Sequence, residues 1–340
     1  MRVDCSPMTE RQLAPWIAAQ TAQLLQQRGH AWLLYGPSGL GQFRLAMEVA
    51  AAWLCESVGT NGACGICPSC HSLRVHTHAD LCVLMPETTM LQHGWPLSEK
   101  AQTEIDDKKR KPSREIRVDA MRDAVEFSQR TSARGRGKAV LVFPAEQMNA
   151  ITANALLKTL EEPPGDVKFV LATESVHQLL PTIRSRCLGH AMLWPSTAAG
   201  QHWLQAHGVP ATQSAMLLRT AGGRPDDALD YFVSGREVSA WSNVVQALAR
   251  GEVAFFKEWP VSQMVNTLQM VCHDAMAQLA GAQPRFIAGD DWRGRPSWTG
   301  LSGWSQALMT TRRTMDHPYN AGLMLESLVA QAKTALNSRD

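Results

Sequence analysis

The segment His-Ala-Trp-Leu-Leu-Tyr at residues 30–35 runs directly into Gly-Pro-Ser-Gly-Leu-Gly at residues 36–41. The first part is mostly apolar, which predicts a buried strand, and residues 43–53 have the apolar periodicity of a helix. A strand, a glycine-rich turn and a helix, in this order, form the context that a phosphate-binding loop requires. We therefore predict an α/β fold built around this segment.

The rest of the first half continues this alternation of strands and helices. Apolar runs predict further strands of a parallel sheet at residues 81–84, 139–143 and 168–173, and helical patterns cover residues 15–27, 118–129 and 152–160. Between Pro86 and Arg117 the pattern breaks, and we predict a long exposed loop there. Its basic run, residues 108–111, is interpreted as a solvated part of that loop, with contact to DNA phosphates as the alternative. After Pro195 only helical patterns follow.

Composition limits the class of protein. The 340 residues include 33 basic and 31 acidic side chains, so the net charge is only +2 and no basic field covers the whole molecule. No apolar run approaches the roughly 18 residues that span a bilayer, and the first residues lack the apolar core of a secretion signal. We therefore expect a cytoplasmic protein without a membrane partner. In that reducing compartment, the eight cysteines point to metal ligands or buried thiols.

Four of the cysteines have the spacing of a metal site. Cys55, Cys64, Cys67 and Cys70 follow the pattern C-x8-C-x2-C-x2-C. Short two-residue spacers allow neighbouring thiolates to reach one tetrahedral ion, and four sulfurs leave no open position for catalysis. We predict structural Zn²⁺, with an iron–sulfur cluster as the minor alternative. The remaining cysteines, Cys5, Cys82, Cys187 and Cys272, are predicted to be buried small residues.

The glycine loop lacks the side chains that handle nucleotide phosphates. A competent loop continues from its last glycine with Lys and Ser or Thr, whereas Gly36, Gly39 and Gly41 are followed by Gln42 and Phe43. Phosphoryl transfer depends on positioned positive charge and metal, so we expect no hydrolysis here. The backbone could still hold an anion, and the alternative is a simple tight turn.

The predicted strand at 139–143 gives a second, independent sign of a lost active site. It ends in Phe143 and Pro144, where an active enzyme carries an acidic pair that holds magnesium and orients water. Glu146 is the nearest acid, and it is out of place.

Three stretches resemble one family. Residues 154–164 (NALLKTLEEPP), 167–173 (VKFVLAT) and 185–187 (SRC) are similar to motifs of the AAA+ subunits of bacterial DNA polymerase III clamp loaders. The resemblance covers about residues 10–235. It implies that Thr173 is the polar residue called sensor one, so that Gly36, Gly39, Gly41, Gln42 and Thr173 outline a degenerate nucleotide site.

Within this family the chain resembles a non-hydrolysing subunit more than the motor subunits gamma and tau. The motor subunits keep the lysine and threonine of the loop, and at their sensor-two arginine this chain has Asp226, with Arg224 out of register. The resemblance implies a hetero-oligomer with gamma or tau and the delta subunit, which uses ATP held by the motor subunits to place the beta sliding clamp on primed DNA. We expect the chain itself to have no ATPase or polymerase activity.

The resemblance also implies a role for Arg186. In the family, the arginine of the Ser-Arg-Cys motif acts in trans as an arginine finger on a neighbour's ATP, a contribution typically worth about 10³ to 10⁵ in rate. The alternative is a helix cap or a surface ion pair, and Arg184 is a weaker candidate for the finger. We assign no chemistry to Glu161 and Glu162, which are interpreted as local caps or pairs.

The expected architecture has three parts. Residues 1–194 form an AAA+ ATPase-like domain with the cysteine module at 55–70, residues 195–235 a small helical lid, and residues 236–340 a helical oligomerisation (collar) domain. Two other functions remain open: an ATPase that is active in cis with an unusual loop, and a zinc-dependent nucleic-acid-binding module.

Overall fold

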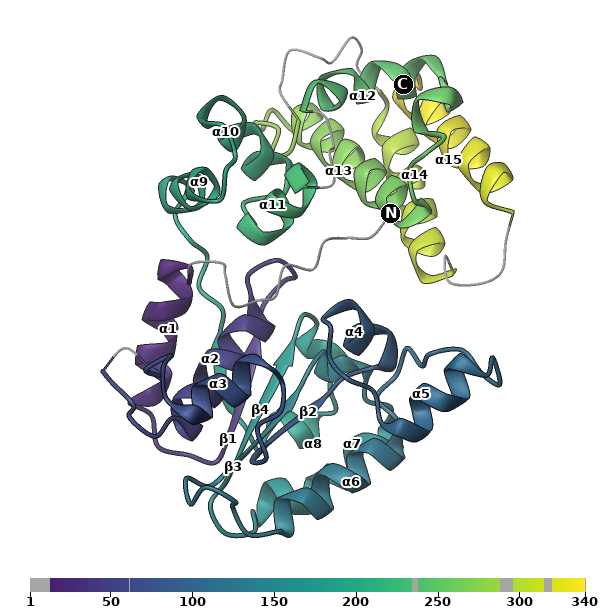
Figure 1. Ribbon diagram of the computed structural model, residues 1–340. Coiled ribbons are helices and arrows are strands. Elements are labelled where there is room, and N and C mark those ends of the chain that lie inside the picture. The colour runs from purple at the N-terminus through teal and green to yellow at the C-terminus, as the bar shows by residue number, and fades with distance from the viewer. Residues whose placement is uncertain (1–12, 61, 234–237, 288–295, 315–319, 340) are drawn as a thin grey trace. The chain divides into compact units, whose positions relative to one another are not determined.

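The computed structural model describes residues 13–60, 62–233, 238–287, 296–314 and 320–339. The chain forms two compact units, of which the first ends at Ala199 and the second begins at Gly200 (Figure 1). Each unit is built on its own core, and the first holds every residue that the sequence predicts for the sites. The predicted lid and collar lie together in the second unit, so their separation into two domains stays a prediction.

The first unit is organised by a five-stranded parallel sheet in the order β2-β3-β4-β1-β5. The strands are β1 (Ala31–Tyr35), β2 (Leu81–Leu84), β3 (Lys138–Val142), β4 (Val167–Thr173) and β5 (Leu188–Ala191). The first four lie within one residue of their predicted bounds, which confirms the parallel α/β class. The sequence analysis missed β5, because this short edge strand contains Gly189 and exposes most of its side chains.

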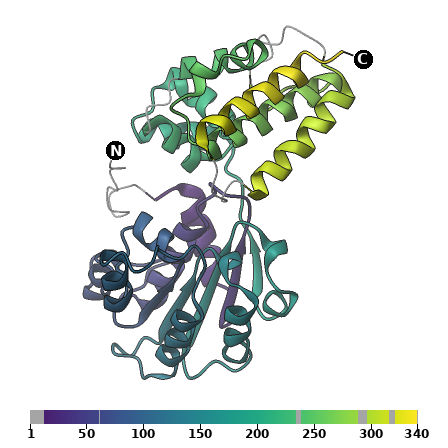
Figure 2. The ribbon, with the colours of Figure 1, turned by 90° about the vertical axis from the view of Figure 1, so that its right-hand side faces the viewer.

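Helices cover both faces of this sheet (Figures 1 and 2). Because successive side chains of a strand point to opposite faces, neighbouring residues of β1 meet different helices. Trp32 packs against Trp53 at a ring distance of 4.8 Å, whereas Leu33 joins a buried cluster with Met121 and Leu156. The first face carries α1 (Pro15–Leu25), α2 (Gln42–Leu54) and α3 (Pro68–Arg74), and the second carries α6 (Val118–Gln129), α7 (Ala150–Glu161) and α8 (Pro181–Arg184).

The prediction of a long exposed loop between Pro86 and Arg117 was wrong. This segment contains α4 (Glu87–Gln92) and α5 (Glu99–Asp106). The guanidinium of Arg110 ties them together, because its Nη2 donates to Glu87 Oε1 at 2.7 Å and its Nε to Glu104 Oε2 at 2.7 Å. The pairing lowers the pKa of Glu87, chiefly through the hydrogen bonds from Arg110. The pair of Arg110 with Glu87 joins residues that are far apart in sequence, so local periodicity gave no sign of it.

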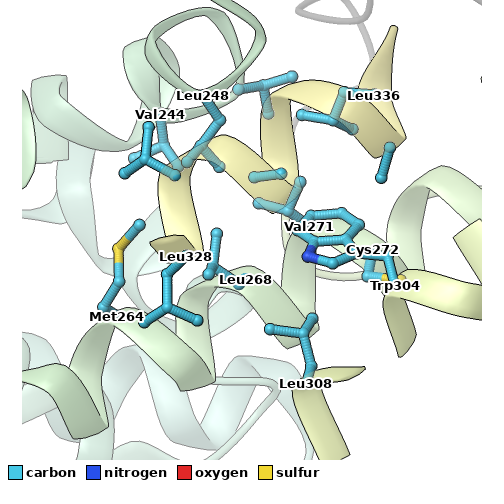
Figure 3. Close-up of a cluster of buried hydrophobic side chains, with 14 of the residues drawn as sticks. Val244, Leu248, Met264, Leu268, Val271, Cys272, Trp304, Leu308, Leu328 and Leu336 are labelled. Carbon is cyan, nitrogen blue, oxygen red and sulfur yellow. The ribbon is translucent and has the colours of Figure 1, made fainter. Parts of the chain in front are cut away.

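All regular elements in the described residues of the second unit are helices. Helix α9 (Thr197–Ala206) crosses the boundary between the units, and it is followed by α10 (Ala211–Thr220), α11 (Pro225–Val233), α12 (Val238–Arg250), α13 (Val261–Leu279), α14 (Trp298–Thr314) and α15 (Ala321–Leu336). Side chains of the last four pack into one buried cluster that includes Leu248, Leu268, Trp304 and Leu328 (Figure 3). Arg285 also donates from Nη2 to the carbonyl of Gly222 at 3.1 Å, which links the predicted lid and collar segments. Short 3-10 turns complete the chain at Ala145–Gln147, Val176–Gln178 and Val253–Phe256.

Among the helices that the structure describes, none combines the length and apolarity needed to cross a bilayer.

Of the cysteines outside the four-cysteine cluster, Cys272 is buried as predicted and Cys82 and Cys187 are half-buried, while Cys5 lies outside the described residues.

A buried ion pair fixes the loop that precedes β3. The carboxylate of Asp80 accepts hydrogen bonds from the backbone N–H groups of Ala133 at 2.7 Å and Arg134 at 2.9 Å. It also lies 3.5 Å from Nζ of Lys138, whose side chain is only 5% exposed. Burial opposes the charge on Asp80, but these donors outweigh it and lower the pKa of the carboxyl.

Replacing Asp80 with Asn should lower the free energy of unfolding by about 3–5 kcal/mol at pH 7, because it leaves the ammonium group of Lys138 buried without its partner. Since the folded-state pKa of Asp80 is lowered, its contribution is complete above the unfolded pKa of about 3.9 and is lost as the pH falls through the folded value. Urea denaturation at pH 7 and in acid measures both effects. Asp119→Asn, on the exposed surface of α6, should change stability by less than about 0.5 kcal/mol. A loss of that small size for Asp80→Asn would contradict the assignment.

Candidate functional sites

The four predicted metal ligands converge between α2 and α3. Cys55 follows α2, Cys67 caps the N-terminus of α3, and Cys70 lies in its first turn. The sulfur atoms of Cys55 and Cys67 are 3.9 Å apart, those of Cys64 and Cys70 are also 3.9 Å apart, and those of Cys55 and Cys70 are 3.7 Å apart. All four sulfurs lie within 4.8 Å of one another, so this cluster could hold a metal ion.

These distances fit zinc closely. A tetrahedral ion with Zn–S bonds of about 2.3 Å requires sulfur atoms about 3.8 Å apart. Backbone N–H groups point at the sulfurs: Cys64 donates to Cys55 Sγ at 3.3 Å, and Cys70 to Cys67 Sγ at 3.4 Å. Burial opposes the thiolate of Cys67, but hydrogen bonds that include the one from Cys70 lower its pKa to about 6. A thiolate is the form that binds metal, and four sulfurs fill the coordination sphere of a structural ion.

Two neighbouring histidines, His76 and His78, make contacts outside this sulfur cluster. His76 stacks on Trp95 with the ring centres 4.0 Å apart, and Nδ1 of His78 accepts from the backbone N–H of Asp80 at 3.1 Å.

A network that the sequence did not reveal anchors the cysteine module to the sheet domain. Oε1 of Glu56 accepts from Ser69 Oγ at 2.8 Å and from Nη1 of Arg134 at 2.9 Å. Arg134 belongs to the loop that Asp80 holds before β3. The module is therefore fixed to the edge of the sheet independently of its own sulfur atoms, through residues whose spacing in sequence gave no signal.

The glycine loop joins a strand to a helix as predicted, and the side chain of Gln42 hydrogen-bonds to two of its carbonyl groups. Gly39 and Gly41 have positive φ angles of 77° and 85°, a conformation that favours glycine. Nε2 of Gln42 donates to the carbonyl oxygens of Gly36 at 2.8 Å and Pro37 at 2.7 Å, and the side chain is 2% exposed. The residue that replaces the phosphate-binding lysine thus binds the loop itself.

Phe43, which replaces the magnesium-binding hydroxyl, is part of an aromatic cluster. Its ring is 5.3 Å from that of Phe143 in a stacked arrangement and 5.0 Å from that of His93. Both phenylalanines are buried, and burial lowers the pKa of His93, which disfavours a charge there. An apolar, neutral cluster is a poor environment for a hydrated divalent cation, which requires oxygen ligands.

Thr173 lies beside the glycine loop, as the resemblance implied. The backbone N–H of Gly36 donates to the carbonyl of Thr173 at 3.4 Å, so the ends of β1 and β4 meet. The Thr173 hydroxyl is buried and donates to Oε2 of Glu146 at 2.7 Å, and Oε1 of Glu146 accepts from the backbone N–H of Glu174 at 3.0 Å. Glu146, which the sequence analysis left out of the site, is therefore engaged in capping the end of β4.

Arg186 lies apart from this loop, at the surface after α8. Its Nε donates to Oε1 of Glu161 at 2.6 Å, and its Nη1 to the carbonyl of Thr182 at 2.8 Å. Glu161 was interpreted from the sequence as a local cap or pair, and its position at the end of α7 brings it to Arg186.

Together, the parallel sheet, the glycine loop and the four-cysteine module define an ATPase-type fold with Gln42 and Phe43 at the positions where a competent loop has lysine and a hydroxyl. A family model described as DNA polymerase III, delta subunit, matches residues 16–192. The chain is 41% identical over 215 residues to DNA polymerase III subunit delta' of Pseudomonas aeruginosa, a match that covers 62% of this chain and 58% of the relative. The chain belongs to the DNA polymerase III delta-prime family.

Two relatives from Escherichia coli extend the comparison. Subunit delta' is 32% identical over 242 residues, which are 69% of this chain and 65% of the relative. Subunit tau is 33% identical over 247 residues, which are 70% of this chain but 32% of the relative. The matches thus span about three fifths of the two delta' relatives' length, and a smaller share of tau.

We expect the purified chain to contain about one zinc ion, measured by atomic emission against protein concentration. Cys67→Ser should lose most of this metal and unfold at a lower temperature, because structural zinc contributes directly to folding. Cys82→Ser, a half-buried cysteine outside the cluster, is the matched control and should retain the metal. Full metal content in Cys67→Ser, or iron in place of zinc, would contradict the assignment.

Restoring lysine and threonine at the loop (Gln42→Lys with Phe43→Thr) should not create a nucleotide site. The double variant loses two buried hydrogen bonds and an aromatic contact, so its free energy of unfolding should fall by about 3–5 kcal/mol. Titration calorimetry with MgATP and urea denaturation test the two expectations, and retained zinc shows that the variant is folded. Micromolar MgATP binding by the double variant would show that the site has lost little besides these two side chains.

Proposed function

We propose that this chain is the non-hydrolysing subunit of a DNA polymerase III clamp loader and that it supplies Arg186 in trans to the ATP site of a neighbouring motor subunit. The observation that carries the proposal is that Gln42, which stands where a competent loop has its lysine, is buried and hydrogen-bonded to the carbonyl groups of its own glycine loop. A subunit without the lysine and the metal-binding hydroxyl would contribute to ATP turnover through another subunit's site.

The surroundings of the loop support the absence of hydrolysis in cis. The aromatic cluster of Phe43 and Phe143 stands where magnesium and an acidic pair would be needed. Glu146, the nearest acid, is engaged by Thr173. The alternative of an ATPase active in cis therefore finds neither the metal ligands nor the base that the reaction requires.

Arg186 is suited to a role in trans by its place on the surface. Its side chain is 31% exposed, and it lies on a different element from the glycine loop. Arginine presents a fork of N–H donors that matches phosphate geometry, and it stabilises charge on the transferring phosphoryl group. In this proposal, the neighbouring ATP belongs to gamma or tau, the delta subunit completes the assembly, and the complex places the beta clamp on primed DNA in the cytoplasm.

The cysteine module has a structural role in this proposal. Four thiolates would hold zinc with no open position, so the ion would stabilise the module and take no part in the chemistry. The alternative of a zinc-dependent nucleic-acid-binding module receives little support, because the net charge is only +2. Arg110, in the basic run considered for DNA contact, is bound to Glu87 and Glu104.

The proposal is tested by ATP turnover in the presence of clamp and primed DNA, for the chain alone and for the chain reconstituted with its motor and delta subunits. The chain alone should be inactive, and the wild-type chain should stimulate turnover in the complex. Arg186→Ala should lower turnover at the adjoining motor site by about 10³-fold or more, the usual contribution of an arginine finger.

Arg184→Ala is the matched control, since it removes an exposed arginine two residues away and should keep the stimulation. Gel filtration must show that both variants assemble. Full stimulation by assembled Arg186→Ala would leave the chain a scaffold without a finger, and turnover by the chain alone would establish the cis ATPase.

A further inference from the structure

The guanidinium of Arg186 is folded back onto its own segment. Nε donates to Oε1 of Glu161 at 2.6 Å, and Nη2 donates to the same oxygen. Nη1 donates to the carbonyl of Thr182 at 2.8 Å and to the hydroxyl of Ser185 at 3.3 Å. An acid from the end of α7 and two groups from the α8 turn thus hold the side chain against the surface of the sheet domain.

This arrangement leaves too few donors for a phosphate group. A guanidinium carries five N–H bonds, and the contacts of Arg186 engage four of them. Bidentate recognition of a phosphate requires two parallel N–H donors. In this conformation Arg186 can bind a phosphate that way only after Glu161 or the α8 groups have released it.

We propose that Glu161 is a latch. It holds Arg186 against the surface of the free chain and releases it on assembly, when the ATP phosphates of the neighbouring subunit replace the Glu161 carboxylate as its partner. This inference rests on the proposed function of Arg186. Glu161 is a positioning residue that touches no substrate itself. In the free chain, the carboxylate of Glu161 neutralises the arginine. In the assembled complex, negatively charged phosphate oxygens take the place of this carboxylate.

A comparison with Arg110 supports the exchange. Arg110 is bound to two acids, Glu87 and Glu104, and the side chain of Glu87 is only 10% exposed. By contrast, the side chains of Arg186 and Glu161 are 31% and 48% exposed, and within the described part of the chain Arg186 has one acidic partner. Exposed ion pairs contribute little stability and are weakened by salt, so the pair of Arg186 is the one of the two that a stronger anion can displace.

Glu161→Gln tests the latch, because it keeps the size of the side chain and removes its charge. The chain is titrated into motor and delta subunits with clamp and primed DNA, and ATP turnover is measured. The concentration of Glu161→Gln chain that gives half-maximal stimulation should be about two- to fivefold lower than for wild type, the range expected for a surface ion pair. The maximal ATP turnover should be the same for both chains. The difference between their half-maximal concentrations should shrink as the salt concentration is raised.

Glu162→Gln is the matched control. It removes the same charge from the adjacent exposed position, while among the described residues Glu161 is the acid paired with Arg186. The control should behave as wild type, which separates release of the arginine from a general loss of negative charge beside the neighbour's ATP.

A measurement on the chain alone detects the ion pair independently of assembly. In nitrogen-15 spectra of arginine side chains, the Nε–H signal of Arg186, assigned by its absence in Arg186→Ala, should exchange faster with water in Glu161→Gln. The signal should be unaffected in Glu162→Gln.

Two results would overturn the latch. A lower maximal turnover with Glu161→Gln would mean that Glu161 orients the finger during turnover. If neither the half-maximal concentration nor the water exchange of the Arg186 Nε–H changes in Glu161→Gln, no latch exists. Arg186→Ala distinguishes failure of the latch from failure of the proposed function. If Arg186 is not a finger, Arg186→Ala stimulates ATP turnover as well as wild type, whatever the result for Glu161→Gln.

Discussion

The pairing of β4 with strands on both of its sides is the constraint on which the first unit depends. Carboxyl ends of parallel strands meet at one edge of a sheet, so β1, β3 and β4 deliver the glycine loop, Phe143 and Thr173 to the same place. The hydrogen bond from Gly36 to Thr173 joins segments that are distant in sequence. This geometry alone would create a nucleotide site, and only the side chains set into it determine whether the site is used.

Those side chains make contacts within the protein. Gln42 donates to the carbonyl groups of Gly36 and Pro37, and the rings of Phe43 and Phe143 stack on each other. A site that holds nucleotide gains stability from its ligand, so its conformation depends on ligand concentration. In the proposed function, a loop that takes no nucleotide has no such dependence. The sheet domain could then keep one conformation through the ATP cycle of the neighbouring subunits.

Sequence reasoning succeeded where the information was local. The strands β1 to β4, the glycine-rich turn after β1 and the clustering of the C-x8-C-x2-C-x2-C cysteines all depend on neighbouring residues, and all were predicted. It failed where a side chain acts across the fold. Arg110 and Glu87 organise a segment predicted as a loop, and Arg134 anchors the cysteine module to Glu56. Gln42 is instructive: its sequence signal was a missing lysine, and its contacts with the loop emerged only from the structure.

The pairing of Arg186 with Glu161 is the surface ion pair that the sequence left open as the alternative to the finger. In the proposed function, the ion pair and the finger are different states of one side chain. An arginine that must meet phosphate has to remain on the surface, and an exposed carboxylate satisfies it there at a gain of at most about 1 kcal/mol. Charge-assisted, bidentate bonds to a phosphate in a water-excluded interface are considerably stronger. In the proposed function, the weak ion pair with Glu161 therefore holds Arg186 in place in the free chain without competing effectively with the phosphates of the neighbour's ATP.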